Sequence, residues 1–362
     1  MKSALRLALV AGALALEGCV LLAPGPKVDF HPIDVPMSAE KKALIDRTEH
    51  YRRSESTSYM SFPEWYLVFN PQELAQTLQE KRPSAFPYFK SIGQFWGGYG
   101  QVYGLTRPYY PFDFGDHLML NVIGSSTTVE YLIRGVYENS VGRATELLSF
   151  GARSEEEDYA AQAAKEYGDF IPTEPWFDFP FGHKLVGLWT KTPFFGWNFL
   201  RKTERKLILS TEYGFKSIYA AVIRLASHAV YGVADTRVYA TARTIPANAF
   251  DDPDVKKIQD FDDGSTLITV PHYQGFTDTV PKLAALGVDF VEVAGNDEIL
   301  LTIVAPADWQ YDLSAGMELF SQDMLASPGE KRVAIQAPIA SLGAMLREIQ
   351  GKKLRIEHLY DY

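Results

Sequence analysis

The hydrophobic pattern of this chain changes near residue 240, and that change restricts the folds it can adopt. Before this point apolar residues recur at helical spacing, most clearly along 198–231. After it come short runs rich in β-branched residues, separated by Gly, Asn and Asp. The pattern predicts an α+β protein: an N-terminal mostly α-helical, aromatic-rich domain at 38–245, followed by a βαβ-type α+β domain at 255–362.

Capping signals mark where helices of the first domain begin. Ser154 is followed three residues later by Glu157, a capping box in which each side chain binds the other residue's backbone amide. The same spacing at Ser61–Glu64 and at Asn70–Glu73 predicts two more helix starts. Apolar periodicity predicts further helices at 39–53, 87–103, 114–138 and 198–231.

The second domain alternates short strands with two helices. The helices are expected to begin near Thr279 and Ile339 and to end at Gly287 and Gly351. The strands are expected at 266–270, 288–293, 299–305, 332–337 and 354–360.

The order of these elements resembles a ferredoxin-like α/β sandwich with an extra strand, a likeness of order that carries no function. Gly295, Asn296 and Asp297 predict a hairpin between the second and third strands. The interruption at 245–254, with its prolines and acidic residues, predicts the domain boundary.

The N-terminus carries a targeting pattern. Lys2 and Arg6 precede an apolar run, and the chain's one cysteine, Cys19, follows it directly. This resembles the bacterial lipoprotein export signal, although Glu17 stands where that pattern has an uncharged residue. The resemblance implies a signal and lipid-anchor segment at 1–19, with the lipid on Cys19, and a tether at 20–37.

Two other interpretations of the N-terminus stay open. An uncleaved anchor over 4–23 has the length to span a bilayer, and an ordinary signal peptide would be removed. In all three cases the positive charges stay cytoplasmic, so the body is exported. The expected location is the bacterial cell envelope, with the body in the periplasm.

Composition and motifs exclude several classes of function. The net charge of −10 argues against a nucleic-acid partner. The sequence contains no nucleophile elbow, zinc motif, phosphate loop or EF-hand loop. The seven histidines share no metal-binding spacing, and a single cysteine excludes a disulfide within the chain. We therefore expect no cofactor and no metal.

Charged residues at helical spacing provide weak catalytic candidates. Glu130, Arg134 and Glu138 recur every four residues, so both intervals can form ion pairs. We expect this ladder to be partly buried against the 198–231 helix, whose own charged residues would complete the network. Those residues are Arg201, Glu204 and Arg205, and Glu212 and Lys216 follow one to three turns later on the same helix. Glu130 and Arg134, together with His117, are the candidates for catalysis.

Aromatic, Gly- and Pro-rich connections join the predicted helices. Their rings either cover the core or line a groove for an apolar ligand. On the second interpretation the weak ligand-binding candidates are Trp96, Tyr99, Tyr109 and Trp176.

Two functions from different classes follow, beside a third alternative, a structural subunit whose exposed aromatic residues form an interface. The first is a membrane-tethered, periplasm-facing envelope protein that binds a partner protein or an apolar ligand at its helical part. The second is an exported, hydrolase-like enzyme with a polar cleft between the two domains.

Overall fold

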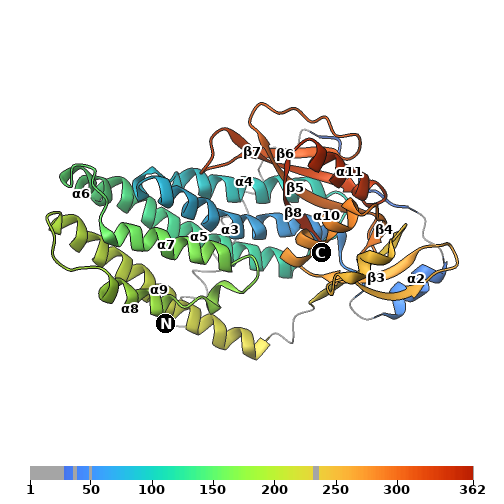
Figure 1. Cartoon of the computed structure of the whole chain (residues 1–362), viewed down its shortest axis with the longest axis horizontal. Helices are drawn as coiled ribbons and strands as arrows, with labels where there is room; N and C mark the ends of the chain where they lie inside the picture. The colour runs from blue at the N-terminus through green and yellow to red at the C-terminus, as the bar shows by residue number, and fades with distance from the viewer. Residues whose placement is uncertain (1–27, 36–38, 49–50, 231–235, 362) are drawn as a thin grey trace. The chain divides into compact units, whose positions relative to one another are not determined.

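A computed structural model describes residues 28–35, 39–48, 51–230 and 236–361 (Figure 1). It confirms the α+β class, with a helical region followed by two four-stranded antiparallel sheets with helices. The chain divides into two compact units. Among the described residues, the helical unit comprises 65–95 and 123–230, and the sheet unit comprises the others. Cys19 lies outside the described residues.

The helical unit contains helices from several stretches of the chain. Three helices contribute residues to both units: α3 (Glu55–Glu80), α4 (Tyr88–Thr106) and α5 (Phe114–Tyr137). The π-helical turn η2 (Glu138–Gly142) continues α5. The helices that follow are α6 (Arg143–Leu148), α7 (Glu155–Phe170), α8 (Phe181–Lys191) and α9 (Phe199–Val230), and two 3-10 turns, η1 (Pro83–Ala85) and η3 (Trp176–Asp178), connect the elements.

The capping signals gave one correct helix start and two wrong ones. Ser154 and Glu157 form the expected capping box at the start of α7. The Ser61 and Asn70 patterns both lie inside α3, so neither begins a helix. Buried aromatic side chains continue along α3 through both patterns, and their burial outweighs the local capping preference. They are Tyr59, Phe62, Tyr66 and Phe69.

The sheet unit is built from two antiparallel sheets that share one core with two helices. The strand orders are β2-β3-β1-β4 and β6-β7-β5-β8. The first sheet contains β1 (Arg237–Arg243), β2 (Lys256–Asp260), β3 (Thr266–Pro271) and β4 (Asp289–Val293). The second contains β5 (Glu298–Pro306), β6 (Met317–Asp323), β7 (Glu330–Pro338) and β8 (Arg355–Tyr360). The unit's helices are α2 (Ala39–Arg47), α10 (Gln274–Ala285) and α11 (Ile339–Gly351), with a 3-10 turn, η4 (Ala247–Asp251).

The five expected strands are present, but their connection differs from the expectation in one place. The predicted hairpin is wrong, because β4 pairs with β1 whereas β5 pairs with β7 and β8. The turn at Gly295, which has a φ of 79°, therefore carries the chain from one sheet to the other. The sequence analysis missed β1, β2 and β6. β1 precedes the 245–254 interruption and pairs with β3 after it.

The helix ends also differ from the expected ones. α10 begins at Gln274, so Pro281 lies inside the helix and does not begin it. α2 ends at Arg47, earlier than expected. Within the described residues, no helix combines the length and the apolar composition needed to cross a membrane.

Candidate functional site in the helical unit

A cavity of about 110 Å³ lies inside the helical unit. Most of its wall is apolar or aromatic, and α3, α5, α7 and α9 all contribute to it, together with the connection that contains Phe179. The residues of this wall are Leu67, Leu74, Leu78, Tyr131, Ala160, Ala163, Tyr167, Phe179, Phe181, Leu209 and Tyr213. The lining also includes two acidic and two basic residues and the uncharged polar residues Asn70 and Thr127, so the cavity combines an apolar surface with a polar, charged one.

These four charged residues form a closed ring of ion pairs. Arg134 Nη1 lies 3.2 Å from Glu130 Oε1 and 3.2 Å from Glu212 Oε1. Lys216 Nζ lies 2.8 Å from Glu130 Oε1 and 3.4 Å from Glu212 Oε1. Each acid therefore contacts both bases, and the formal charges of the ring cancel.

The pKa shifts of Glu130, Arg134 and Lys216 favour their charged forms. Burial alone would raise the pKa of Glu130, but Lys216 and Arg134 outweigh this effect and the pKa lies below its usual value. Burial alone would lower the pKa of Lys216, yet the two carboxylates raise it above the usual value. The pKa of Arg134 is raised in the same way. At neutral pH the cavity therefore presents charged, mutually satisfied groups.

Aromatic rings cover the basic side chains of the ring. The Lys216 ammonium lies 5.6 Å from the ring centre of Phe181 and 5.8 Å from that of Tyr167. The Arg134 guanidinium lies 5.8 Å from the ring centre of Tyr88. These cation–π contacts fix the cations at the boundary between the charged and apolar surfaces of the cavity.

A second buried cluster joins η2 to α9. Arg205 Nη1 lies 2.9 Å from Glu138 Oε1, and Arg205 also pairs with Glu204. Arg201 bridges Glu204, at 3.2 Å, and Glu157 of α7, at 2.6 Å. The guanidinium of Arg201 also donates to the Gly142 carbonyl oxygen at 2.8 Å.

The expected charge ladder is therefore divided between the two clusters. Glu130 and Arg134 pair at the predicted i, i+4 spacing. The α9 residues that complete their cluster are Glu212 and Lys216, and not the expected Arg201, Glu204 and Arg205. Glu138 forms its ion pair with Arg205, and Arg134 forms its second ion pair with Glu212. The π-helical turn η2 begins at Glu138, the residue at which the ladder divides.

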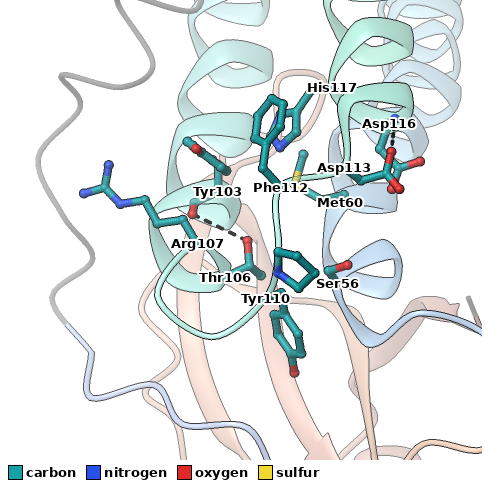
Figure 2. Close-up of a pocket in the computed structure, with 11 residues that line it drawn as sticks. Ser56, Met60, Tyr103, Thr106, Arg107, Tyr110, Phe112, Asp113, Asp116 and His117 are labelled. Atoms are coloured by element: carbon teal, nitrogen blue, oxygen red, sulfur yellow. Dashed lines mark hydrogen bonds between the residues drawn. The ribbon is translucent and has the colours of Figure 1, made fainter.

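His117 lines a different cavity, one of about 60 Å³ in the sheet unit (Figure 2). Its ring stacks on Phe112, with the ring centres 4.2 Å apart, and its Nδ1 lies 2.5 Å from the hydroxyl oxygen of Tyr99. Burial lowers the pKa of His117 against the opposing effect of Asp113, so the ring is neutral at pH 7. The structure does not bring His117 into the cavity that Glu130 and Arg134 line.

The four aromatic candidates do not form one site. Trp96 and Tyr99 pack together in the sheet unit, with ring centres 6.0 Å apart. Tyr109 is 42 % exposed and its hydroxyl lies 2.9 Å from His31 Nδ1. Trp176 belongs to the helical unit and packs against Tyr219.

The aromatic residues that do line the cavity of the helical unit were missed. Phe179 and Phe181 follow Trp176 in the same Pro-rich connection, so this connection was the available signal. Tyr131, Tyr167 and Tyr213 lie within helices, where their spacing indicates only a helical face. Across the described residues, no three His, Cys, Asp or Glu side chains are grouped so that they could hold a metal ion.

Comparisons of the chain with protein-family models, with curated proteins and with solved structures find no match. The function therefore has to be inferred from the chemistry of the site.

Proposed function

We propose that this chain is a membrane-tethered, periplasm-facing bacterial envelope protein whose helical unit binds an apolar ligand. The cavity lined by Glu130, Arg134, Glu212 and Lys216 is the binding site. The observation that carries the proposal is the composition of this cavity, which places a self-neutralised ring of charges beside a wall of aliphatic and aromatic side chains.

The cavity favours a ligand with an apolar group and a small polar end. Its volume of about 110 Å³ is well above the roughly 10–15 Å³ that a cavity needs to hold one water. Water in contact with the apolar wall would lack hydrogen-bond partners, so part of an acyl chain or an aromatic ring fits this wall better. The charged ring can accept or donate hydrogen bonds to the ligand's polar end.

The membrane tether is the second part of the proposal, and its support is the resemblance of 1–19 to a lipoprotein signal. A triacylated Cys19 would hold the protein firmly, whereas one acyl chain binds membranes only marginally. Cells grown with labelled palmitate should label the wild-type chain and not Cys19→Ala. Membrane retention of an unlabelled wild-type chain would overturn lipidation in favour of an uncleaved anchor.

Extraction of the purified chain tests the ligand-binding part. Wild-type protein released from membranes should yield an apolar compound in organic extracts, identified by mass spectrometry. Ala163→Leu fills the cavity from its wall and should remove that compound. Ala144→Leu adds the same atoms at an exposed position on α6 and should keep it. Equal amounts of the compound in both variants would overturn the proposed site.

A hydrolase is the second candidate, and one observation favours it. Asp113, Asp116 and His117 line the same small pocket, a combination that can support general acid–base chemistry (Figure 2). The purified chain would then hydrolyse short p-nitrophenyl esters, and His117→Gln would abolish that activity while leaving the unfolding transition in place. Absence of hydrolysis by the wild type would remove this candidate for esters.

A further inference from the structure

The outer surface of α9 has the opposite polarity to that of an ordinary helix on a water-soluble protein. The charged residues of its first turns are buried: Arg201, Lys202, Glu204, Arg205 and Lys206. Between Phe199 and Leu225, the residues of α9 that are exposed as a whole are all uncharged. These exposed residues are Phe199, Leu200, Leu207, Thr211, Phe215, Ile218, Ala221, Val222 and Leu225. The one charged side chain with comparable exposure in this range is Arg224, which is 42 % exposed and pairs with Asp178.

The exposed residues form one continuous stripe. From Leu207 to Leu225 they follow intervals of three and four residues, which places them on one face of the helix. At 1.5 Å per residue this part of the stripe is about 27 Å long. Ile218 is 70 % exposed and Leu225 is 76 % exposed, so within the described residues the protein leaves this face uncovered.

An exposed aromatic cluster extends the stripe into the connection between α8 and α9. Phe194, Phe195 and Phe199 contact one another, with ring centres 5.1–6.1 Å apart. Trp189 stacks on Phe194, and Trp197 is 73 % exposed beside them. Tryptophan is enriched where membranes meet water, because its ring is apolar and its N–H is polar.

The exposed surface of α7 is polar, in contrast to the exposed surface of α9, so the helical unit also has a surface suited to water. The exposed residues of α7 are Glu155, Asp158, Gln162, Lys165, Glu166 and Asp169. A unit with a charged helix surface and an apolar helix surface can lie at a membrane with only the apolar surface in lipid.

We propose that the exposed stripe of α9 and the aromatic cluster before it, together called the α9 face, lie in the interfacial region of a phospholipid bilayer. Protein interfaces carry about one hydrogen bond per 100–200 Å² and a polar rim. Along the stripe only Thr211 offers a hydrogen-bonding side chain, so lipid suits the α9 face better than a protein partner or a second copy. The exposed Lys191 at the end of α8 adds a cation next to the cluster, where anionic headgroups would bind.

The inference does not depend on the cavity ligand and can be tested in the full chain. Cys19 is the only cysteine, so a Cys19→Ser background accepts a single fluorescent label at a chosen position. Ile218→Cys and Leu225→Cys report on the α9 face, and Gln162→Cys and Lys165→Cys on α7 are matched controls. Each labelled chain is reconstituted into vesicles of phosphatidylethanolamine and phosphatidylglycerol in a 3:1 ratio, containing a trace of doxyl-labelled lipid.

The proposal expects doxyl lipid to quench the α9 labels strongly and aqueous iodide to quench them weakly. The α7 labels should respond in the opposite way. Iodide quenching of both helices alike would overturn the proposal, as would shielding of the α9 labels that depends on protein concentration, which indicates a second copy. Circular dichroism of each variant must match that of Cys19→Ser, so that a change in quenching does not come from unfolding. Absence of palmitate from Cys19 in the wild-type chain would overturn the proposed tether but not this inference.

Discussion

The ammonium of Lys216 lies 2.8 Å from the carboxylate of Glu130, which joins α9 to α5 inside the helical unit. This contact illustrates how the unit is organised. The charged side chains in the first turns of α9 are buried and pair with acidic residues of other elements, while the outer surface of α9 is largely apolar. Buried ion pairs offset the desolvation of their charges only when each partner is present, so the unit should be sensitive to the loss of one member.

Lys216→Met should destabilise the protein by about 2 kcal/mol, between the values for exposed and for fully buried pairs, because it leaves two partly buried carboxylates facing a single Arg134. The matched control is Lys165→Met. Lys165 pairs with Asp169 at the same i, i+4 spacing, but both side chains are more than half exposed, and its loss should cost under about 0.5 kcal/mol. Urea unfolding measures the loss of unfolding free energy in the two variants. Equal losses would show that burial does not increase the contribution of the ring's ion pairs to stability.

A pair of double-mutant cycles tests how the two clusters are divided. Arg134→Met combined with Glu212→Gln should show a coupling energy of about 1–3 kcal/mol, because these residues contact each other. Arg134→Met combined with Glu204→Gln should be additive within about 0.5 kcal/mol, because Glu204 pairs with Arg201 and Arg205. Strong coupling in the second cycle would mean that the clusters act as one network.

Glu64 should make the protein less stable as the pH rises. Burial, with a smaller contribution from Asp116, raises the pKa of Glu64 to about 7, whereas an unfolded Glu has a pKa of about 4.3. The folded state therefore binds more protons between these values, and its stability falls as the pH rises from about 4.3 to 7. Glu64→Gln should be more stable than the wild type by about 2 kcal/mol at pH 8 and by little at pH 4. Denaturant unfolding at the two pH values checks this, and a pH-independent difference would contradict it.

Removing β8 should prevent the sheet unit from folding. A chain ending at Gly351 lacks Leu359 and Tyr360, both completely buried, and leaves the edge of β5 unpaired. We expect this truncated chain to be insoluble on expression. The milder Leu359→Ala should stay soluble and lose about 2–5 kcal/mol of stability. A soluble, cooperatively unfolding truncated chain would refute the expectation.

Local patterns in the sequence predicted individual helices and contacts within a helix better than they predicted which parts of the chain pack against each helix. The expected helix at 198–231 begins one residue before α9 and covers all of its described length, because its apolar period is long. The i, i+4 spacing also predicted the contact between Glu130 and Arg134. Periodicity could not show that Ile218 and Leu225 face outward. An apolar stripe predicts a helix, but it does not indicate whether another part of the protein packs against that face.

The cavity could not be predicted for a related reason. Its wall combines Leu74, Tyr131, Phe179 and Leu209 from four separate segments, and only tertiary packing brings them together. The turn at Gly295 is a similar case. Its residues favour a tight turn, but whether the next strand joins the same sheet depends on pairing with β7, far along the chain.

Native mass spectrometry of the intact chain, released from membranes in a mild detergent, tests the central claim most directly. The account predicts a peak for the wild type that carries one added compound of fixed mass, the same peak for Ala144→Leu, and only the bare chain for Ala163→Leu. A wild-type spectrum with the bare chain alone, or an adduct that survives in Ala163→Leu, would contradict the claim that this cavity holds an apolar ligand.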